Sequence, residues 1–178
     1  VSLTSDRMKE KQTAEELIRK VQAAKTGTVT HMDANSKKVK PPLLYDLTSL
    51  QRDANKYYGF TAQQTLDYTQ SLYEKKLATY PRTDSRYLTD EMEESTANLA
   101  EQMRQKYGFT KILQMNVKQV INGKKVSDHH AIIPTVNVAG ADYSTIPAGE
   151  QKILGLITAR LLAAIGEPAE ITEFHLEV

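Results

Sequence analysis

Apolar residues recur at intervals of three and four positions in five segments of the chain, which is the spacing of one face of an α-helix. The spacing is most regular at Ile153, Leu154, Ile157 and Leu161. Three of the segments begin with a capping box, in which a Thr and a Glu or Gln three residues later satisfy each other's free backbone donors. The pattern predicts helices at residues 14–24, 48–58, 61–74, 89–106 and 151–164.

Strand patterns lie mainly at the two ends of the chain. Residues 171–178 alternate between apolar and polar side chains, which is typical of a half-buried strand. Residues 28–40 predict a short hairpin that turns at residues 33–35. Residues 115–138 are expected to be mostly extended, with a tight turn at residues 122–123, where Asn precedes Gly.

These elements predict an α+β fold with two domains. The middle of the chain is mainly helical and contains two short helices joined by a glycine turn, an arrangement that resembles a helix-turn-helix. We expect residues 44–143 to form this helical domain, inserted into a small outer domain of mixed helix and strand made of residues 1–43 and 144–178. In the outer domain, a strand near the N-terminus would pair with the C-terminal strand.

Composition and charge exclude several classes of protein. The chain has 23 Lys and Arg against 22 Asp and Glu, so its net charge of +1 does not by itself indicate a nucleic-acid-binding protein, although lysines cluster. It has no cysteine, which excludes disulfides and cysteine zinc sites. No apolar run approaches the roughly 20 residues of a membrane span, and no signal peptide is visible. We therefore expect a soluble cytoplasmic protein and, because the chain begins with Val1, a fragment of a longer one.

Residues 80–84 contain a phenol, a guanidinium and a carboxylate at alternate positions. In an extended chain, Tyr80, Arg82 and Asp84 project on the same side. Because a phenol with a pKa near 10 is a weak nucleophile at neutral pH, a neighbouring guanidinium would help by favouring the phenolate and by gripping a phosphate. The structural alternative is a partly buried Tyr80 beside a surface ion pair between Arg82 and Asp84.

Two adjacent histidines, His129 and His130, lie in the second chemically informative segment. On an extended chain they point to opposite faces, so at most one reaches a shared site. A histidine can donate a hydrogen bond to a phosphate or transfer a proton. A zinc site is disfavoured, because the chain has only four histidines and no cysteine; a metal-free structural pair is the other alternative.

Together these segments resemble the type IA DNA topoisomerase family. Residues 79–84 (T-Y-P-R-T-D) resemble its active-site motif, and residues 128–135 (D-H-H-A-I-I-P-T) resemble its downstream histidine motif. Residues 47–51 (L-T-S-L-Q) resemble the lead-in to its inserted domain, one residue shorter than the family pattern. The proline after the tyrosine and the double histidine favour the topoisomerase III branch.

The resemblance implies that Tyr80 attacks a phosphodiester in single-stranded DNA and forms a 5′-phosphotyrosyl intermediate, so that strands are cut, passed and resealed without ATP. Arg82 would stabilise charge on the phosphate, and His129 aligns with the family's catalytic-region histidine. The expected supporting residues are Asp84, Thr83 and His130. The expected DNA contacts are Arg82, Ser85 and Gln51.

The family binds magnesium in an acidic domain that precedes these segments. Nothing in the chain resembles its carboxylate cluster, since residues 90–94 have the pattern of a helix start, where carboxylates favour the helix dipole. We therefore expect no metal site in this fragment. Mg²⁺ would bind in a domain of the same polypeptide that is absent here, and the fragment alone would not relax supercoiled DNA. The expected partners are single-stranded DNA and the missing domains, without membrane contact, and the nucleoid is the expected location in a bacterial host.

Two other functions share features with this sequence. The helix-turn-helix-like pair also fits a DNA-binding module without chemistry, in which Tyr80 would be buried. A tyrosine recombinase places an H-x-x-R motif before its tyrosine, whereas here Tyr80 precedes His129 and no H-x-x-R occurs. The sequence leaves the first alternative open and disfavours the second.

Overall fold

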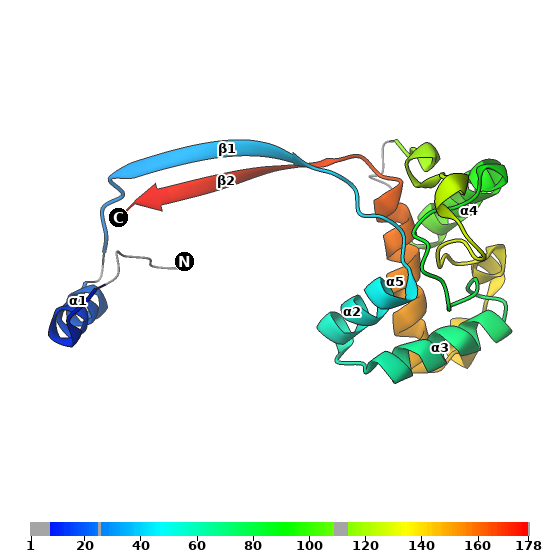
Figure 1. Cartoon of the computed structure of the whole chain (residues 1–178), viewed down its shortest axis with the longest axis horizontal. Coiled ribbons are helices and arrows are strands. Elements are labelled where there is room, and N and C mark those ends of the chain that lie inside the picture. Colours follow the sequence, from blue (N-terminus) through cyan, green and yellow to red (C-terminus); the bar gives the residue numbers. More distant parts are fainter. Residues whose placement is uncertain (1–7, 25, 109–113, 178) are drawn as a thin grey trace. The chain divides into compact units, whose positions relative to one another are not determined.

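The chain divides into two compact units, seen in a computed structural model that describes residues 8–24, 26–108 and 114–177. We call Lys38–Ala169 the helical unit, and the two ends of the chain, up to Lys37 and from Glu170, the end unit. Figure 1 shows the helices and strands of both units. Their mixture confirms the α+β class predicted from the sequence.

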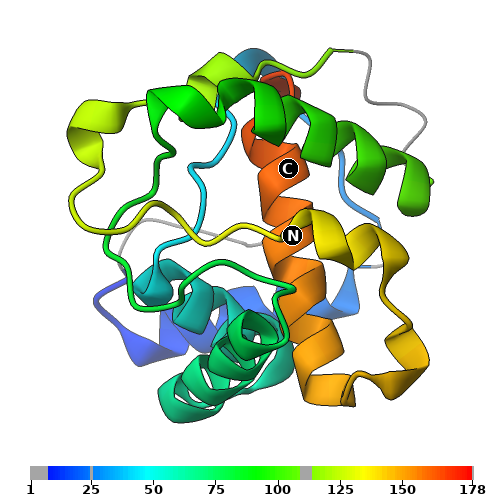
Figure 2. The same ribbon diagram turned by 90° about the vertical axis from the view of Figure 1, so that its right-hand side faces the viewer.

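The helical unit is built around a central helix. Its helices are α2 (Leu47–Tyr58), α3 (Ala62–Glu74), α4 (Glu93–Lys106) and α5 (Ala148–Ala164). Helix α5 packs against the other three and passes through the middle of the unit (Figure 2). It is largely apolar, with Ile153, Ile157 and Leu161 fully buried, and a helix of this kind is stable only where other elements cover it.

Local capping sets the ends of α2 and α3. Helix α3 begins at the predicted capping box, where the Gln64 N–H donates to the Thr61 hydroxyl at 3.1 Å. Helix α2 instead uses a box formed by Asp46 and Ser49, two residues earlier than predicted. It ends at Gly59, whose φ of +69° is in the left-handed region that glycine adopts without strain.

Residues 115–138 do not form the mostly extended segment that the sequence predicted. The segment contains 3-10 turns at Val117–Val120, Gly123–Lys125 and Val136–Gly140, the second of them at the predicted tight turn. Between these turns it pairs with other segments through single bridges, such as Ile121 with Leu88. Because its partners change from one bridge to the next, no continuous strand ladder forms.

The end unit contains helix α1 (Lys11–Ala23) and a two-stranded sheet of β1 (His31–Val39) and β2 (Ala169–Glu177). The two strands run in opposite directions (Figure 1), and the Thr30 N–H donates to the Glu177 carbonyl at 2.8 Å. The predicted pairing of an N-terminal strand with the C-terminal strand is confirmed. The predicted hairpin at 28–40 is wrong, because the polar residues expected to turn continue one strand.

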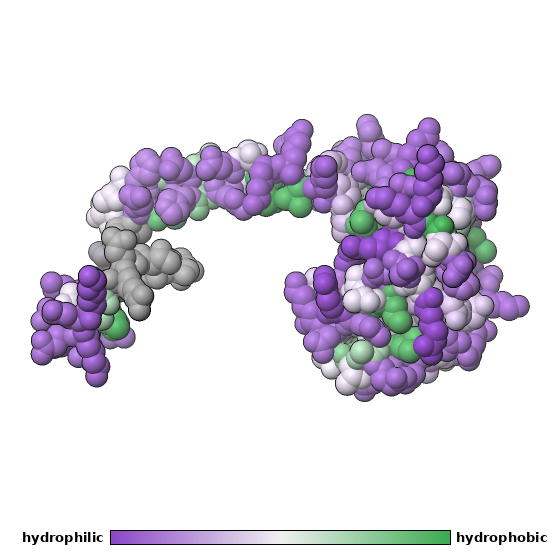
Figure 3. Space-filling model, in the orientation of Figure 1, coloured by the Kyte–Doolittle hydropathy of each residue, from purple (hydrophilic) through white to green (hydrophobic). Residues whose placement is uncertain are grey.

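Side chains of the two strands are exposed throughout their length. Figure 3 shows apolar side chains along them. Met32, Phe174 and Leu176 are among the exposed large apolar residues of the two strands. An ion pair between Lys37 and Glu173 crosses the sheet. The sheet therefore rests on backbone hydrogen bonds and cross-strand pairs, with no buried side chain of its own among the described residues.

The boundaries between the units differ from the predicted boundaries. The units meet at Lys38 and Ala169, whereas the sequence placed the inserted domain at residues 44–143. The difference arises from α5, which the sequence assigned to the outer domain. This largely apolar helix needs partners over most of its surface, and α2, α3 and α4 supply them.

We predict that Ile157→Ala destabilises the helical unit by about 2–5 kcal/mol, because it leaves a cavity at a fully buried position of α5. Val136→Ala, which truncates a side chain that is 57% exposed, is the matched control and should change the free energy of unfolding by less than about 0.5 kcal/mol. Urea unfolding followed by circular dichroism measures both. Equal effects of the two substitutions would contradict a core centred on α5.

Candidate active site

The backbone around Tyr80 is attached to the histidine segment by a threonine on either side. The Thr79 N–H donates to the Ile133 carbonyl at 3.0 Å. The Thr79 hydroxyl accepts from the Ile133 N–H at 3.0 Å and donates to the Ala131 carbonyl at 3.2 Å. Beyond Tyr80, the buried Thr83 hydroxyl donates to the His129 carbonyl at 2.9 Å. Two motifs far apart in sequence are thereby held side by side.

Tyr80 and His129 contact each other directly. Their ring centroids are 4.3 Å apart and their planes are inclined by 45°. Tyr80 is half-buried and His129 is exposed, so both rings reach the surface. Within the described part of the chain, the Tyr80 hydroxyl forms no hydrogen bond, and it is therefore not committed to a structural role.

Residues 81–85 alternate between buried and exposed side chains, as the sequence predicted for an extended run. Pro81, Thr83 and Ser85 are buried, whereas Arg82 and Asp84 are exposed. The outward positions therefore carry the charged groups, which project from the same stretch of chain as Tyr80.

Arg82 and Asp84 do not form the ion pair of the structural alternative. The Asp84 carboxylate accepts a long hydrogen bond from the Ser127 hydroxyl at 3.5 Å. The Arg82 guanidinium has no hydrogen-bonding or ionic partner among the residues that the structure describes. Its five N–H donors are thus available to a ligand, and phosphate is a group that they fit well.

Ser85, which the sequence suggested as a DNA contact, is buried and bonded within the protein. Only 5% of its surface is exposed. Its hydroxyl donates to the Lys125 carbonyl at 2.9 Å, and its N–H donates to the Thr83 hydroxyl at 3.1 Å. Its polar groups therefore bond to the protein's own backbone and side chains in this structure.

His130 and Gln51 also bond within the protein. The Nδ1 atom of His130 lies 2.8 Å from the Ala131 carbonyl oxygen. The half-buried ring is thus within hydrogen-bonding distance of the backbone of the next residue. The Gln51 amide donates to the Ala62 carbonyl at 3.0 Å and fastens α2 to the start of α3. Of the two adjacent histidines, only His129 forms a ring contact with Tyr80 in the described part of the chain.

A second tyrosine at the site was missed by the sequence analysis. The Tyr73 ring, on the last turn of α3, lies edge-to-face against Tyr80 with centroids 5.4 Å apart. Tyr73 is 41% exposed. No local pattern indicates this contact, because it depends on the turn that brings the chain back from the end of α3.

Tyr45 lies close in the fold but has the opposite environment. It is buried, pairs with Ile132 through a β-bridge and donates a hydrogen bond to Asp53 at 2.6 Å. The Arg160 guanidinium forms an ion pair with the same carboxylate and lies 4.1 Å from the centre of the Tyr45 ring. Burial, and then the bond to Asp53, raise the pKa of the Tyr45 phenol above its ordinary value. Tyr45 is therefore a structural residue and a poor nucleophile.

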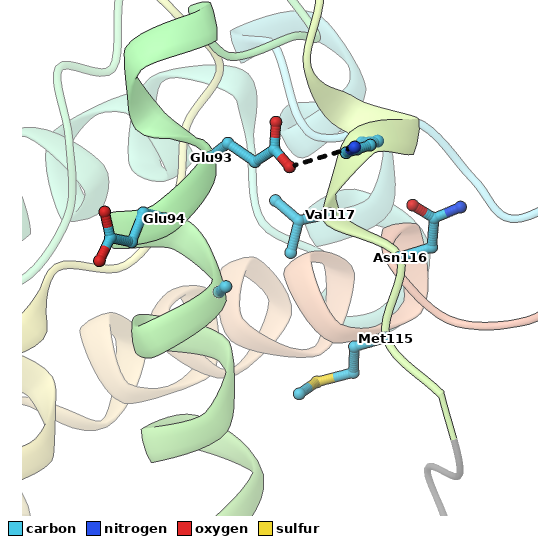
Figure 4. A pocket seen from close by; sticks show the side chains of 7 residues that line it. Glu93, Glu94, Met115, Asn116 and Val117 are labelled. Atoms are coloured by element: carbon cyan, nitrogen blue, oxygen red, sulfur yellow. Dashed lines mark ion pairs between the residues drawn. The ribbon is translucent and has the colours of Figure 1, made fainter.

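A separate pocket of about 380 Å³ shares no residue with this site (Figure 4). Glu93 and Lys118 face each other across it at 3.9 Å. Its described lining residues are Glu93, Glu94, Ala97, Met115, Asn116, Val117 and Lys118. Two carboxylates at the start of α4 make it unsuited to a polyanion.

The described residues contain neither a metal-binding cluster nor a helix that could span a membrane. No three His, Cys, Asp or Glu side chains among them lie close enough together to hold a metal ion. They do not fit a magnesium site, and no chemical step at Tyr80 is assigned here to a metal. No described helix is long and apolar enough to cross a membrane.

Comparisons with known proteins agree on one family. A family model described as DNA topoisomerase matches residues 1–178. DNA topoisomerase 3 of Bacillus licheniformis is 41% identical over 156 residues, which cover 84% of this chain and 21% of that protein. The Bacillus subtilis protein of the same name is 40% identical. The chain thus spans about one fifth of the length of these curated relatives.

A solved structure has the same fold. Full-length topoisomerase I from Thermotoga maritima superposes with a TM-score of 0.62 at 24% identity, over 98% of this chain and 28% of that chain.

We predict that Thr83→Val destabilises the helical unit by about 1–3 kcal/mol, because the His129 carbonyl and the Ser85 N–H each lose a buried partner. Thr83→Ser is the complementary control, because it keeps the hydroxyl and removes the methyl group that Thr83→Val retains. Urea unfolding of the three proteins measures the difference. Equal stability of the Val and Ser variants would show that these bonds do not hold the two segments together.

Proposed function

The chain belongs to the type IA DNA topoisomerase family, and we propose that Tyr80 is the nucleophile with which it cleaves single-stranded DNA. The contact between the Tyr80 and His129 rings, at 4.3 Å, supports this proposal most strongly. It joins the tyrosine motif to the histidine motif at the surface, where a phosphate can approach both residues.

The proposed reaction is a reversible transesterification. The Tyr80 oxygen attacks the phosphorus of a DNA phosphodiester, and a phosphotyrosyl bond forms to the 5′-phosphate as the bond to the 3′-oxygen breaks. The phenolic proton leaves and the 3′-oxygen gains a proton, so neither water nor ATP is consumed. Attack of the 3′-hydroxyl on the phosphotyrosine reverses the step and reseals the strand.

Arg82 is proposed to bind the phosphate and to stabilise the charge that develops on it. Its exposed guanidinium has no partner within the described chain. A donor that is already in place stabilises the transition state without reorganising during the reaction. Asp84 lies outside ion-pair distance of Arg82. Its carboxylate contributes negative charge near the site and accepts the hydrogen bond from the Ser127 hydroxyl.

His129 is proposed to act on the same phosphate or on a proton. Its ring is exposed beside Tyr80, while its own carbonyl is held by Thr83. An imidazole in this position can donate to a phosphate oxygen or exchange a proton near neutral pH. His130 supports the segment through its bond to the Ala131 carbonyl.

The complete reaction cycle is proposed to need more of the polypeptide than this chain. Its relatives are about four times as long, and the described residues do not fit a metal site. We propose that Mg²⁺ and the surfaces that guide strand passage lie elsewhere in the protein, and that this chain alone does not relax supercoiled DNA. With DNA as its substrate, the protein would act at the nucleoid of a bacterial host.

A DNA-binding module without chemistry is less well supported. The α2–α3 pair with its turn at Gly59 is present, but that reading requires a buried Tyr80 and gives no reason for an unpaired Arg82 beside it. Tyr80 is half-buried with a free hydroxyl in the described part of the chain.

We predict that Tyr80→Phe abolishes the covalent adduct in the full-length protein, because only the attacking oxygen is removed. The adduct is measured with a 3′-labelled single-stranded oligonucleotide and denaturing electrophoresis. Tyr57→Phe, at a tyrosine that is 59% exposed, is the matched control and should form the adduct normally. An unchanged adduct yield in Tyr80→Phe would refute the assignment of the nucleophile.

We predict that Arg82→Lys slows both cleavage and resealing by about 2–4 kcal/mol in barrier height, as expected for the loss of a donor to the transition state. Lysine keeps the charge but not the planar fork that holds two phosphate oxygens. Single-turnover rates and the oligonucleotide Kd separate catalysis from binding, with Arg52→Lys as the control at an exposed arginine. A large rise in Kd with unchanged rates would assign Arg82 to binding alone.

A further inference from the structure

Tyr73 contacts the proposed nucleophile without being part of either motif. Its ring lies edge-to-face against Tyr80, with centroids 5.4 Å apart and planes at 76°. In the described part of the chain, Tyr80 forms ring contacts with Tyr73 and His129. Aromatic pairs prefer this edge-to-face arrangement over a face-to-face stack.

The backbone between the two tyrosines is held firmly. The chain leaves α3 through Lys76, whose φ of +59° is in the left-handed region, and the Lys76 N–H donates to the Tyr73 carbonyl at 2.8 Å. The Lys76 carbonyl in turn accepts from the Asn137 amide at 3.0 Å. Thr79 is then fixed to Ile133. Residue 80 thus returns beside residue 73 in a defined position.

The side chain of Tyr80 is held much less firmly than its backbone. Its hydroxyl has no hydrogen-bonding partner within the described residues, so no polar contact there selects a rotamer. The direction of the hydroxyl is therefore set by what touches the ring. Both of the rings that do so are exposed. Tyr73 extends from a regular helix, whereas His129 lies outside helices and strands, so Tyr73 has the more regularly held backbone.

We propose that Tyr73 is a positioning residue: the edge of its ring holds the Tyr80 ring in the orientation that presents the hydroxyl to the DNA phosphate. This inference rests on the proposed role of Tyr80 as nucleophile. The role belongs to the Tyr73 ring, because its hydroxyl forms no hydrogen bond in the described part of the chain. It is distinct from core packing, because 41% of the Tyr73 surface is exposed while the neighbouring Leu72 fills the core.

The test compares Tyr73→Leu and Tyr73→Phe in the full-length protein. Loss of an edge-to-face pair reduces the population of the held rotamer by roughly 2- to 12-fold. Tyr73→Leu should therefore slow single-turnover adduct formation with a single-stranded oligonucleotide by about that factor, with unchanged oligonucleotide Kd and unfolding midpoint. Tyr73→Phe keeps the ring and should restore the rate. Tyr57→Leu is the matched control at an exposed tyrosine far from either motif in sequence.

Each other outcome overturns the proposal in a recognisable way. An equal loss in Tyr73→Phe and Tyr73→Leu would assign the effect to the hydroxyl. A raised Kd with an unchanged rate would make Tyr73 a surface on which DNA bases stack, and a lowered unfolding midpoint would make it a structural residue. Normal adduct formation by Tyr80→Phe would instead overturn the proposed function, so the two failures are separable.

Discussion

The site depends on hydrogen bonds that tie residues 78–85 to residues 129–134, two segments with little regular secondary structure of their own. Thr79 makes these bonds with its side chain and its backbone N–H, and Thr83 makes its bond with the side chain alone. Each such bond contributes only about 1 kcal/mol net, but an unpaired buried group costs more. The bonds therefore fix the register of the two segments, and the register decides which histidine lies beside Tyr80.

This pair of segments is held in place by the helical core beneath it. Tyr45 connects the histidine segment to the helical core. Its backbone forms a β-bridge with Ile132, and its hydroxyl hydrogen-bonds with Asp53 and Arg160. Asp53 lies on α2 and Arg160 on α5, so one cluster joins both helices to the histidine segment. Separating its charges would leave partly buried groups without partners, and the cluster therefore resists sliding of the helices.

Burial separates the roles of chemically similar residues. Tyr45 and Tyr80 carry the same phenol, but burial raises the pKa of Tyr45 and its oxygen is bonded to Asp53, whereas Tyr80 reaches the surface with a free hydroxyl in the described part of the chain. Ser85 and Arg82 lie in one motif, yet the first faces the interior and the second faces solvent. The alternation of an extended chain produces this division without any specialised loop.

The amino-acid sequence determined what depends on neighbouring residues: the helices, the capping box of α3, the turn at Gly59, the alternation at residues 81–85 and the motifs of the family. It left undecided what depends on distant partners. Only the tertiary structure showed that His129 and Tyr73 contact Tyr80, that Arg82 lacks an ion pair with Asp84, and that Ser85 and Gln51 bond internally. It also placed α5 in the helical core and turned a predicted hairpin into one strand. The physical reason is that periodicity and capping act within a few residues, whereas pairing and burial are set by whichever segments the fold brings together.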